Sequence, residues 1–273
     1  MTTYGVELSH GMHVVHDGPP QAPPLLLIHG SGAAGGCWIP MVPALAEHHH
    51  VIRVDLPGCG HSPPAASYEV PAQAAALAEL LDDLGLRDVS VAGHSSGGYI
   101  ATAPAEQRPD LVHSLTLISS GPRMDALLPQ PFILRFLTGP PLGRLIWSMR
   151  SDAWVRAGIR STAAGPVDVP EELIAGVRGI PYGAFRAVLR ENGAYITERT
   201  VPERLAPLGI PVLVIFGAAD PRWDPASAQS YATVPNARVE MLPGVGHLPL
   251  LEAPEATGEL LLDFVATGAR PEF

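Results

Sequence analysis

Lysine is missing from this chain of 273 residues, in which all 17 basic residues are arginine. Without a lysine amine, the chain cannot form a Schiff base with a carbonyl substrate or anchor pyridoxal phosphate. It also lacks the lysine with which a P-loop holds nucleotide phosphates. The sequence alone therefore excludes amine-based covalent catalysis and P-loop nucleotide hydrolysis.

Cysteine is scarce as well, and no apolar run is long. Cys37 and Cys59 stand in neither a C-x-x-C nor a zinc-binding spacing, so we expect no disulfide framework and a reducing compartment. No uninterrupted apolar stretch approaches the roughly 20 residues of a membrane span, and the first residues lack the pattern of a signal peptide. These absences predict a cytoplasmic protein without a membrane partner.

The chain has fewer basic than acidic residues, 17 against 27, and its formal net charge is −10. This argues against a nucleic acid partner, because phosphate contacts need clustered cations. Hydrophobic residues make up 47% of the chain and charged residues 16%, which is typical of a globular protein with ample core. We expect a small molecule as the partner, and nothing in the sequence sets the oligomeric state.

Short apolar runs alternate with amphipathic ones along most of the chain. Six runs rich in aliphatic residues are typical of buried parallel strands, and they cover residues 25–28, 51–54, 89–92, 115–118, 212–216 and 239–242. Helical patterns cover residues 72–84, 98–107 and 254–266, and we expect Pro104 to kink or shorten the second. The alternation predicts an α/β fold with a mostly parallel, doubly wound sheet.

The alternation stops between residues 122 and 198. That stretch has no convincing strand, so we interpret it as a mainly helical cap inserted over the carboxyl ends of the strands, with a core of residues 1–121 and 199–273. Residues 122–195 hold nine arginines against six acids, together with many large apolar residues such as Phe132, Phe136 and Trp154. This composition favours a hydrophobic acyl or aromatic substrate. The arginines either bind an anionic group of that substrate or face water.

A candidate nucleophile follows the strand at residues 89–92. Gly93-His94-Ser95-Ser96-Gly97 has the G-x-S-x-G pattern, in which a sharp strand-to-helix turn exposes the central serine. Serine is a poor nucleophile at neutral pH and needs a base within hydrogen-bond reach. We therefore predict Ser95 as the nucleophile of a hydrolase.

Eleven histidines compete for the role of general base. His247 lies in a glycine-rich loop between the last strand and the last helix, which places it at the same sheet edge as Ser95. Three histidines in a row, at residues 48–50, cannot all face one ion, so we interpret this tract as a solvated helix end and not as a metal site. We expect His247 as the base, and no metal.

The remaining machinery is predicted from loops that follow strands. Asp220 comes after a strand and a glycine turn, in the order Ser, Asp, His expected for this fold, and Asp224 is the alternative. The oxyanion would receive the backbone N–H groups of Ser96 and Ser31, with Gly32 second to Ser31. For substrate contacts we predict a further set of residues, namely Gly32, His94, Trp38, Trp147 and Leu248.

These motifs together resemble the α/β-hydrolase superfamily, in its esterase, lactonase and C–C hydrolase branch with a cap. The resemblance rests on residues 29–32, 55–62, 93–97, 217–220, 246–247 and 252–255, in that order. It implies an enzyme without a cofactor. Haloalkane dehalogenases and epoxide hydrolases look similar but carry a carboxylate nucleophile at the position of Ser95. The resemblance with a serine there therefore argues against those two activities.

Three functions remain open at this point. The first is hydrolysis of an ester, thioester or lactone through an acyl-enzyme. The second is C–C bond hydrolysis or carboxylate elimination by the same triad. The third is a non-catalytic small-molecule receptor, which a complete triad disfavours because a pure binder does not need a His–Asp pair behind its serine.

Overall fold

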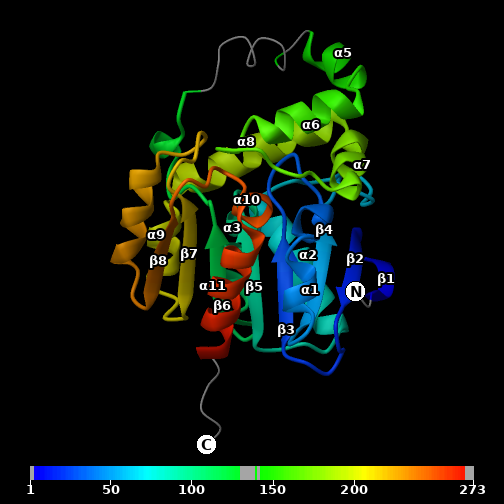
Figure 1. Cartoon of the computed structure of the whole chain (residues 1–273). Helices are drawn as coiled ribbons and strands as arrows, with labels where there is room; N and C mark the ends of the chain where they lie inside the picture. Colours follow the sequence, from blue (N-terminus) through cyan, green and yellow to red (C-terminus); the bar gives the residue numbers. More distant parts are fainter. Residues whose placement is uncertain (1–2, 130–138, 140–141, 268–273) are drawn as a thin grey trace, which may run out of the picture.

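The computed structural model describes residues 3–129, 139 and 142–267. At its centre is an eight-stranded sheet in the order β1-β2-β4-β3-β5-β6-β7-β8 (Figure 1). The strands are β1 (Thr3–Ser9), β2 (Met12–Asp17), β3 (Pro24–Ile28), β4 (His50–Asp55), β5 (Val89–His94), β6 (Val112–Ile118), β7 (Val212–Gly217) and β8 (Ala237–Leu242). Only the pairs β1–β2 and β2–β4 are antiparallel, so the predicted α/β fold with a mostly parallel sheet is confirmed.

Helices cover both faces of this sheet, which explains why its central strands are buried throughout. Every residue of β4, β5 and β7 is buried. One hydrophobic cluster joins the sheet to α2 (Val70–Asp83), α3 (Gly97–Gln107), α9 (Val201–Leu205) and the 3-10 segment η3 (Pro225–Thr233). A second cluster joins the other face to η1 (Gly35–Trp38), α1 (Val42–Leu45), α10 (Pro249–Glu252) and α11 (Pro254–Thr267).

Four helices lie beyond the carboxyl ends of the strands (Figure 1). They are α5 (Gly143–Ser148), α6 (Asp152–Arg160), α7 (Glu171–Gly179) and α8 (Tyr182–Glu198), and they occupy the stretch interpreted as the cap. The described residues from 122 to 198 also include the short 3-10 turn η2 (Met124–Ala126) and contain no strand. Within the described ranges, no helix has the length and apolar character that a bilayer crossing needs.

Pro104 does not shorten its helix, and the expectation for the histidine tract was wrong. Helix α3 continues through Pro104 to Gln107. Because Pro104 lies in its last turn, the ring removes a bond only near the end of the helix. The histidine tract is not a solvated helix end, since His49 and His50 are buried. His50 opens β4, and its Nε2 lies 2.9 Å from Nδ1 of His16 on β2.

Candidate active site

The turn between β5 and α3 holds Ser95 in a backbone conformation that side chains rarely adopt, with φ at +53°. A Cβ atom on Gly97 would fall 2.4 Å from the Ile28 carbonyl oxygen, so no side chain fits beside the serine at that position. The Ser120 hydroxyl donates to the Ser95 carbonyl over 2.6 Å and fixes the turn. The G-x-S-x-G pattern is therefore required by packing, and it presents Ser95 Oγ at the carboxyl edge of the sheet.

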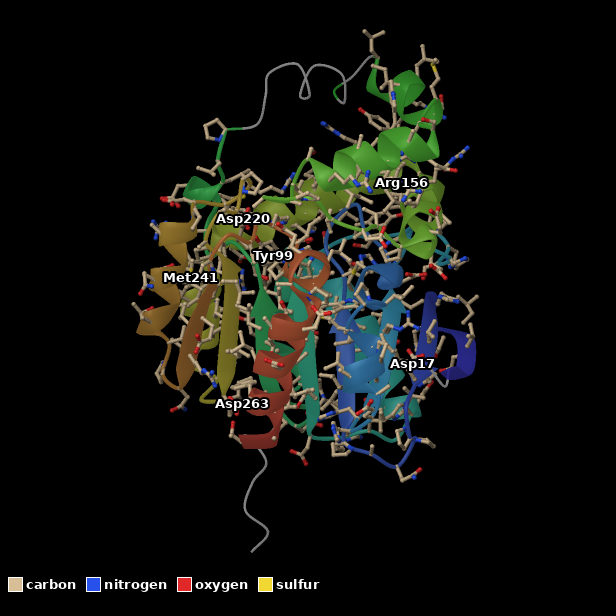
Figure 2. All side chains as sticks on the ribbon, in the orientation of Figure 1. Asp17, Tyr99, Arg156, Asp220, Met241 and Asp263 are labelled. Atoms are coloured by element: carbon tan, nitrogen blue, oxygen red, sulfur yellow. The ribbon has the colours of Figure 1, made fainter. Side chains whose placement is uncertain are left out.

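The structure brings Ser95, His247 and Asp220 together. His247 Nδ1 donates to Asp220 Oδ2 over 2.8 Å, which leaves Nε2 as the acceptor facing Ser95 Oγ at 3.1 Å. Figure 2 shows Asp220 at the end of the sheet that faces the cap helices, whereas Asp263 of α11 lies at the opposite end. His247 and Asp220 are 4% and 3% exposed, which limits the competition of water for their hydrogen bond.

The alternative carboxylate has a different task. Asp224 Oδ1 accepts the Ala226 N–H over 3.0 Å and caps η3. Asp220 instead has its other oxygen, Oδ1, fixed by the N–H groups of Arg222 and Trp223, at 2.7 and 3.2 Å. These two donors aim Oδ2 of Asp220 at the imidazole.

The loop that carries His247 is held from three sides. His94, at the elbow, donates from Nε2 to the His247 carbonyl over 2.8 Å, and burial lowers the pKa of His94 to about 3, so its ring is neutral. Glu252 of α10 accepts the N–H groups of Gly246 and Leu248, at 2.9 and 3.0 Å. The N–H of His247 itself donates to the Thr162 carbonyl in the cap over 2.9 Å. The sequence did not predict the roles of Glu252 and Thr162.

The loop after β3 meets the elbow through two hydroxyl groups. The Ser31 N–H, expected as an oxyanion donor, donates to Ser96 Oγ over 2.8 Å, and the two hydroxyl oxygens are 2.7 Å apart. Asn192 of α8 donates from Nδ2 to Ser31 Oγ over 2.9 Å. Asn192 is 5% exposed, and its Oδ1 has no partner among the described residues. Sequence reasoning missed Asn192, which no motif marks.

The other predicted contact residues lie in three different surroundings. Gly32 has φ at +71°, and a Cβ there would fall 3.1 Å from the Phe185 ring of α8. Leu248 is buried directly after His247. Trp38 is fully buried in the cluster that joins η1 to the sheet, and its indole nitrogen has no partner in the described part of the chain.

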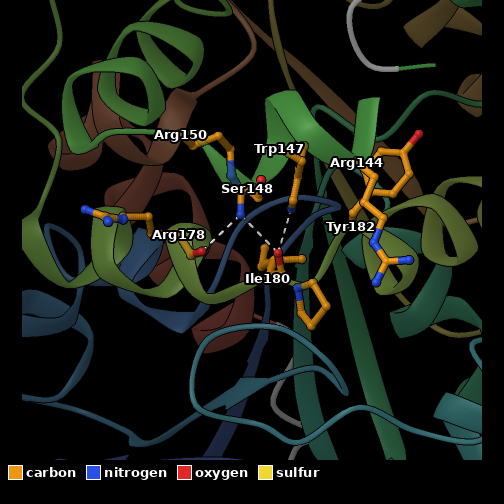
Figure 3. Close-up of a pocket in the computed structure, with 8 residues that line it drawn as sticks. Arg144, Trp147, Ser148, Arg150, Arg178, Ile180 and Tyr182 are labelled. Carbon is orange, nitrogen blue, oxygen red and sulfur yellow. Dashed lines mark hydrogen bonds between the residues drawn. The ribbon is translucent and has the colours of Figure 1, made fainter. Parts of the chain in front are cut away.

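Trp147 lines a cavity of about 360 Å³ within the cap, and Ser95 is not among the residues that line it (Figure 3). Its indole N–H donates to the Ile180 carbonyl over 2.7 Å, and its ring stacks on Phe185 with centroids 4.3 Å apart. The Arg150 guanidinium lies 3.6 Å from the centroid of the Trp147 ring. Burial lowers the pKa of Arg150 to about 10, and its Nε and Nη1 have no partner among the described residues. Trp147 thus connects to the loop after β3 through Phe185, which covers Gly32.

Potential metal ligands lie elsewhere. Among the described residues, the one group with suitable spacing is His13, Asp55 and His61, near the N-terminal hairpin. The triad imidazole and carboxylate are hydrogen-bonded to each other.

A mostly parallel sheet that carries a serine, a histidine and an aspartate in this geometry at its carboxyl edge defines the α/β-hydrolase class. A family model described as "Alpha/beta hydrolase family" matches residues 25–260. The chain belongs to this family and is a hydrolase. It is 30% identical over 268 residues to a pimeloyl-[acyl-carrier protein] methyl ester esterase from Methylococcus capsulatus, and the match covers 90% of this chain and 96% of that protein.

Solved structures of the same class superimpose on the whole chain. A carboxylesterase, CesB from Bacillus subtilis, has a TM-score of 0.77 at 24% identity, covering 97% of this chain and 92% of its own. An N-acyl homoserine lactonase, AidH in complex with N-hexanoyl homoserine, has a TM-score of 0.83 at 23% identity, covering 100% and 99%. At such identities the likeness supports the fold and carries no substrate.

Proposed function

We propose that this protein is a serine esterase that cleaves an ester, thioester or lactone of a hydrophobic small molecule through an acyl-enzyme. The observation that carries the proposal is the continuous hydrogen-bonded path from Ser95 Oγ through His247 to Asp220. The curated relative in Methylococcus capsulatus is named as a methyl ester esterase, which supports an ester substrate here.

In the first half-reaction, His247 Nε2 takes the Ser95 proton while Oγ attacks the substrate carbonyl carbon. Asp220 accepts a hydrogen bond from Nδ1 throughout and stabilises the imidazolium. The tetrahedral intermediate then collapses, and His247 returns the proton to the departing alkoxide or thiolate. In the second half-reaction, water replaces Ser95 as the nucleophile, His247 again moves the proton, and the acid product leaves a free serine.

The hydrogen bonds of the Ser31 and Ser96 hydroxyl groups determine which donors remain for the oxyanion. Ser31 Oγ accepts from Asn192, and Ser96 Oγ accepts from the Ser31 N–H. Because the two hydroxyls are 2.7 Å apart, one of them donates to the other. One hydroxyl hydrogen is then left over. We assign the shared bond to Ser31 as donor, which leaves the Ser96 O–H to point at the substrate carbonyl oxygen.

In this arrangement the Ser31 N–H acts through the Ser96 hydroxyl. The second donor is the backbone N–H of Ser96, because the first N–H groups of a helix have no acceptor in a preceding turn. Both donors are in place before charge develops on the carbonyl oxygen, which is the condition under which such groups stabilise a transition state most. Asn192 is a positioning residue, since it orients the Ser31 hydroxyl from the cap.

The cap supports a hydrophobic acyl group at the site, with Phe185 above Gly32 as its aromatic wall. Several cap arginines form ion pairs with acids, as Arg156 does with Glu171 and Arg178 with Asp152, which favours solvent-facing roles for them. Two buried guanidinium nitrogens of Arg150 have no partner among the described residues, so we keep Arg150 as a candidate for binding an anionic substituent. The apolar residues expected around Phe132 and Phe136 lie outside the described residues.

A panel of p-nitrophenyl esters with matched leaving groups tests the function. We expect multiple turnovers and a preference for longer or aromatic acyl chains over acetate. A single burst without turnover indicates a receptor. Absent ester cleavage, with Ser95 still labelled by a fluorophosphonate, indicates C–C hydrolysis or elimination. The cytoplasmic location and the cap limits at residues 122 and 198 stay predictions, to be checked by cell fractionation and limited proteolysis.

A further inference from the structure

Three side chains with metal-binding atoms meet beside the N-terminal hairpin, apart from the triad. His13 lies on β2, Asp55 ends β4, and His61 follows in the next loop. Their ligand atoms all lie within 4.8 Å of one another. Asp55 Oδ2 is 3.1 Å from His13 Nδ1 and 3.5 Å from His61 Nδ1. We propose that His13, Asp55 and His61 form a binding site for one divalent transition-metal ion, of the kind represented by Zn²⁺ or Ni²⁺.

The carboxylate of this site is held in place before any ion arrives. Asp55 Oδ1 accepts the Gly35 N–H over 2.7 Å, and Oδ2 accepts the His61 N–H over 2.9 Å. The loop closes so tightly around the carboxylate that a Cβ on Gly60 would fall on its oxygens. The Asp55 side chain is 5% exposed, so its oxygens have few other directions to take. A ligand fixed by its own hydrogen bonds loses little freedom when it binds a metal.

The backbone around His13 is tied to the same loop. Its N–H donates to Ser62 Oγ over 2.7 Å, and the Ser62 hydroxyl donates to the Asp55 carbonyl over 2.6 Å. Strand β2 and the loop after β4 are therefore fixed to each other at the point where the two imidazoles meet. The centroids of the His13 and His61 rings are 4.8 Å apart, and the ring planes are tilted by 44°.

The spacing needs only a small adjustment to fit an ion. Bonds of about 2.0–2.2 Å to nitrogen and oxygen place neighbouring ligand atoms roughly 3.3–3.6 Å apart in a tetrahedral shell. The distance of 3.5 Å from Asp55 to His61 already falls there, and the distance of 3.1 Å from Asp55 to His13 is slightly shorter. The His61 side chain, which is 68% exposed, can turn toward His13 without disturbing the core. Its exposure also gives an ion a path of entry and leaves its remaining positions to water.

The donor set selects the class of metal. Two imidazole nitrogens and one carboxylate suit Zn²⁺, Ni²⁺ and Cu²⁺, whereas Mg²⁺ and Ca²⁺ prefer shells made of oxygen. His10 also has two acidic residues nearby, but their positions do not suit a metal ion. His10 has Glu79 at Nδ1 and Asp83 at Nε2, at 3.1 and 2.7 Å, so its carboxylates face opposite ring nitrogens and cannot converge on one ion.

Titration calorimetry of the untagged full chain with ZnCl₂, and the visible absorption of added Co²⁺, test the site. We expect one ion per chain, a tetrahedral Co²⁺ spectrum, and no binding of Mg²⁺. His61→Ala, at an exposed position, should keep the fold and weaken Zn²⁺ binding at least tenfold, since loss of an outer-shell partner alone costs about that much. His13→Gln should do the same, and His10→Gln should bind like the wild type.

The proposal is overturned if His61→Ala and His13→Gln bind Zn²⁺ as the wild-type chain does. It is equally overturned if the wild-type chain binds no Zn²⁺ while circular dichroism shows it folded. Neither readout uses ester turnover, so the result is independent of the proposed esterase function.

Discussion

Ser95 combines a strained backbone conformation with the proposed role of nucleophile. Its φ of +53° is sustained because Gly97 leaves room for the turn and the Ser120 hydroxyl holds the Ser95 carbonyl. Removal of Oγ leaves these supports intact. Ser95→Ala should therefore keep the unfolding midpoint while turnover of a p-nitrophenyl ester falls by up to about 10⁶-fold. A variant that retains more than a tenth of wild-type turnover contradicts the assignment.

The two aspartates of the loop after β7 can be separated by matched substitutions. Asp220→Asn replaces the acceptor of His247 Nδ1–H and allows the ring to take the wrong tautomer, so kcat should fall on the order of 10⁴-fold. Asp224→Asn keeps a cap on η3, because asparagine also caps helices, and should leave kcat nearly unchanged. If Asp224→Asn is the crippling variant in the ester assay, the carboxylate has been misassigned.

The Ser96 hydroxyl is the part of the proposed oxyanion hole that a single substitution can isolate. Ser96→Ala removes a side-chain donor and keeps the backbone N–H, so we expect kcat to fall about 10²–10³-fold with little change in KM. Ser114→Ala is the control, since the hydroxyl of this buried serine on β6 donates to Ser90, away from the site. A Ser96→Ala enzyme with wild-type kcat shows that the Ser31 N–H acts on the substrate directly.

Some residues of the site could be predicted and others could not, for a physical reason. Ser95, Asp220 and His247 follow strand ends, and the parallel sheet gathers strand ends at one edge, so order along the chain was sufficient. Asn192 and Glu252 act through contacts with Ser31 and with the His247 loop, which form only in the folded chain. Trp38 follows a glycine-rich loop and could have faced the site or the core, and no sequence pattern distinguishes the two.

Among the elements, the end of α8 is tied to α3 and α9 by a single carboxylate. Glu106 of α3 accepts the Tyr195 hydroxyl over 2.6 Å, pairs with Arg199, and lies 3.3 Å from the buried guanidinium of Arg204. Arg204 stacks on Tyr195 at 3.7 Å. Through this group, the cap helix that carries Asn192 is fixed to the helix that begins at the nucleophile.

Arg204, whose side chain is 8% exposed, pairs with the mostly buried Glu106. Glu106→Gln removes the negative charge of this partner. We expect the free energy of unfolding to fall by about 3 kcal/mol, the low end for breaking a buried pair. Glu198→Gln is the matched control, because Glu198 pairs with the same guanidinium but is 78% exposed, and the change should stay within about 1 kcal/mol. Equal effects in urea titrations of the two variants contradict the distinction.

Strands were easier to predict than cap helices. The strands β4, β5 and β7 are buried at every position, so each appears in the sequence as a short run rich in aliphatic residues, although Arg53 interrupts β4 and Ser90 interrupts β5. The cap helices α5 and α6 are short and largely exposed, and their limits depend on contacts such as the Ser151 hydroxyl that accepts the Trp154 N–H. The sequence therefore predicted a mainly helical stretch without strands, but not the limits of its individual helices.

Taken as a whole, the molecule buries histidines that the unfolded chain exposes. Burial lowers the pKa of His29, His49, His50 and His94, to about 4 for His50 and about 3 for His94. His10 shifts in the opposite sense, because its hydrogen bond to Asp83 raises its pKa. Four groups therefore favour the folded state at high pH, and one favours it at low pH.

The free energy of unfolding should accordingly be highest above the unfolded histidine pKa of about 6.5 and fall as the pH drops below it. At lower pH the histidines of the unfolded chain bind protons, whereas the buried rings of the folded chain stay neutral. Each such ring contributes a slope of up to about 1.4 kcal/mol per pH unit until the pH reaches its folded pKa. Urea titrations at pH 8, 7, 6 and 5 measure this slope. His50→Gln should reduce it, and His48→Gln, at the exposed neighbouring position, is the matched control. If the free energy of unfolding stays constant from pH 8 to 5, or rises, these buried histidines do not govern how stability depends on pH.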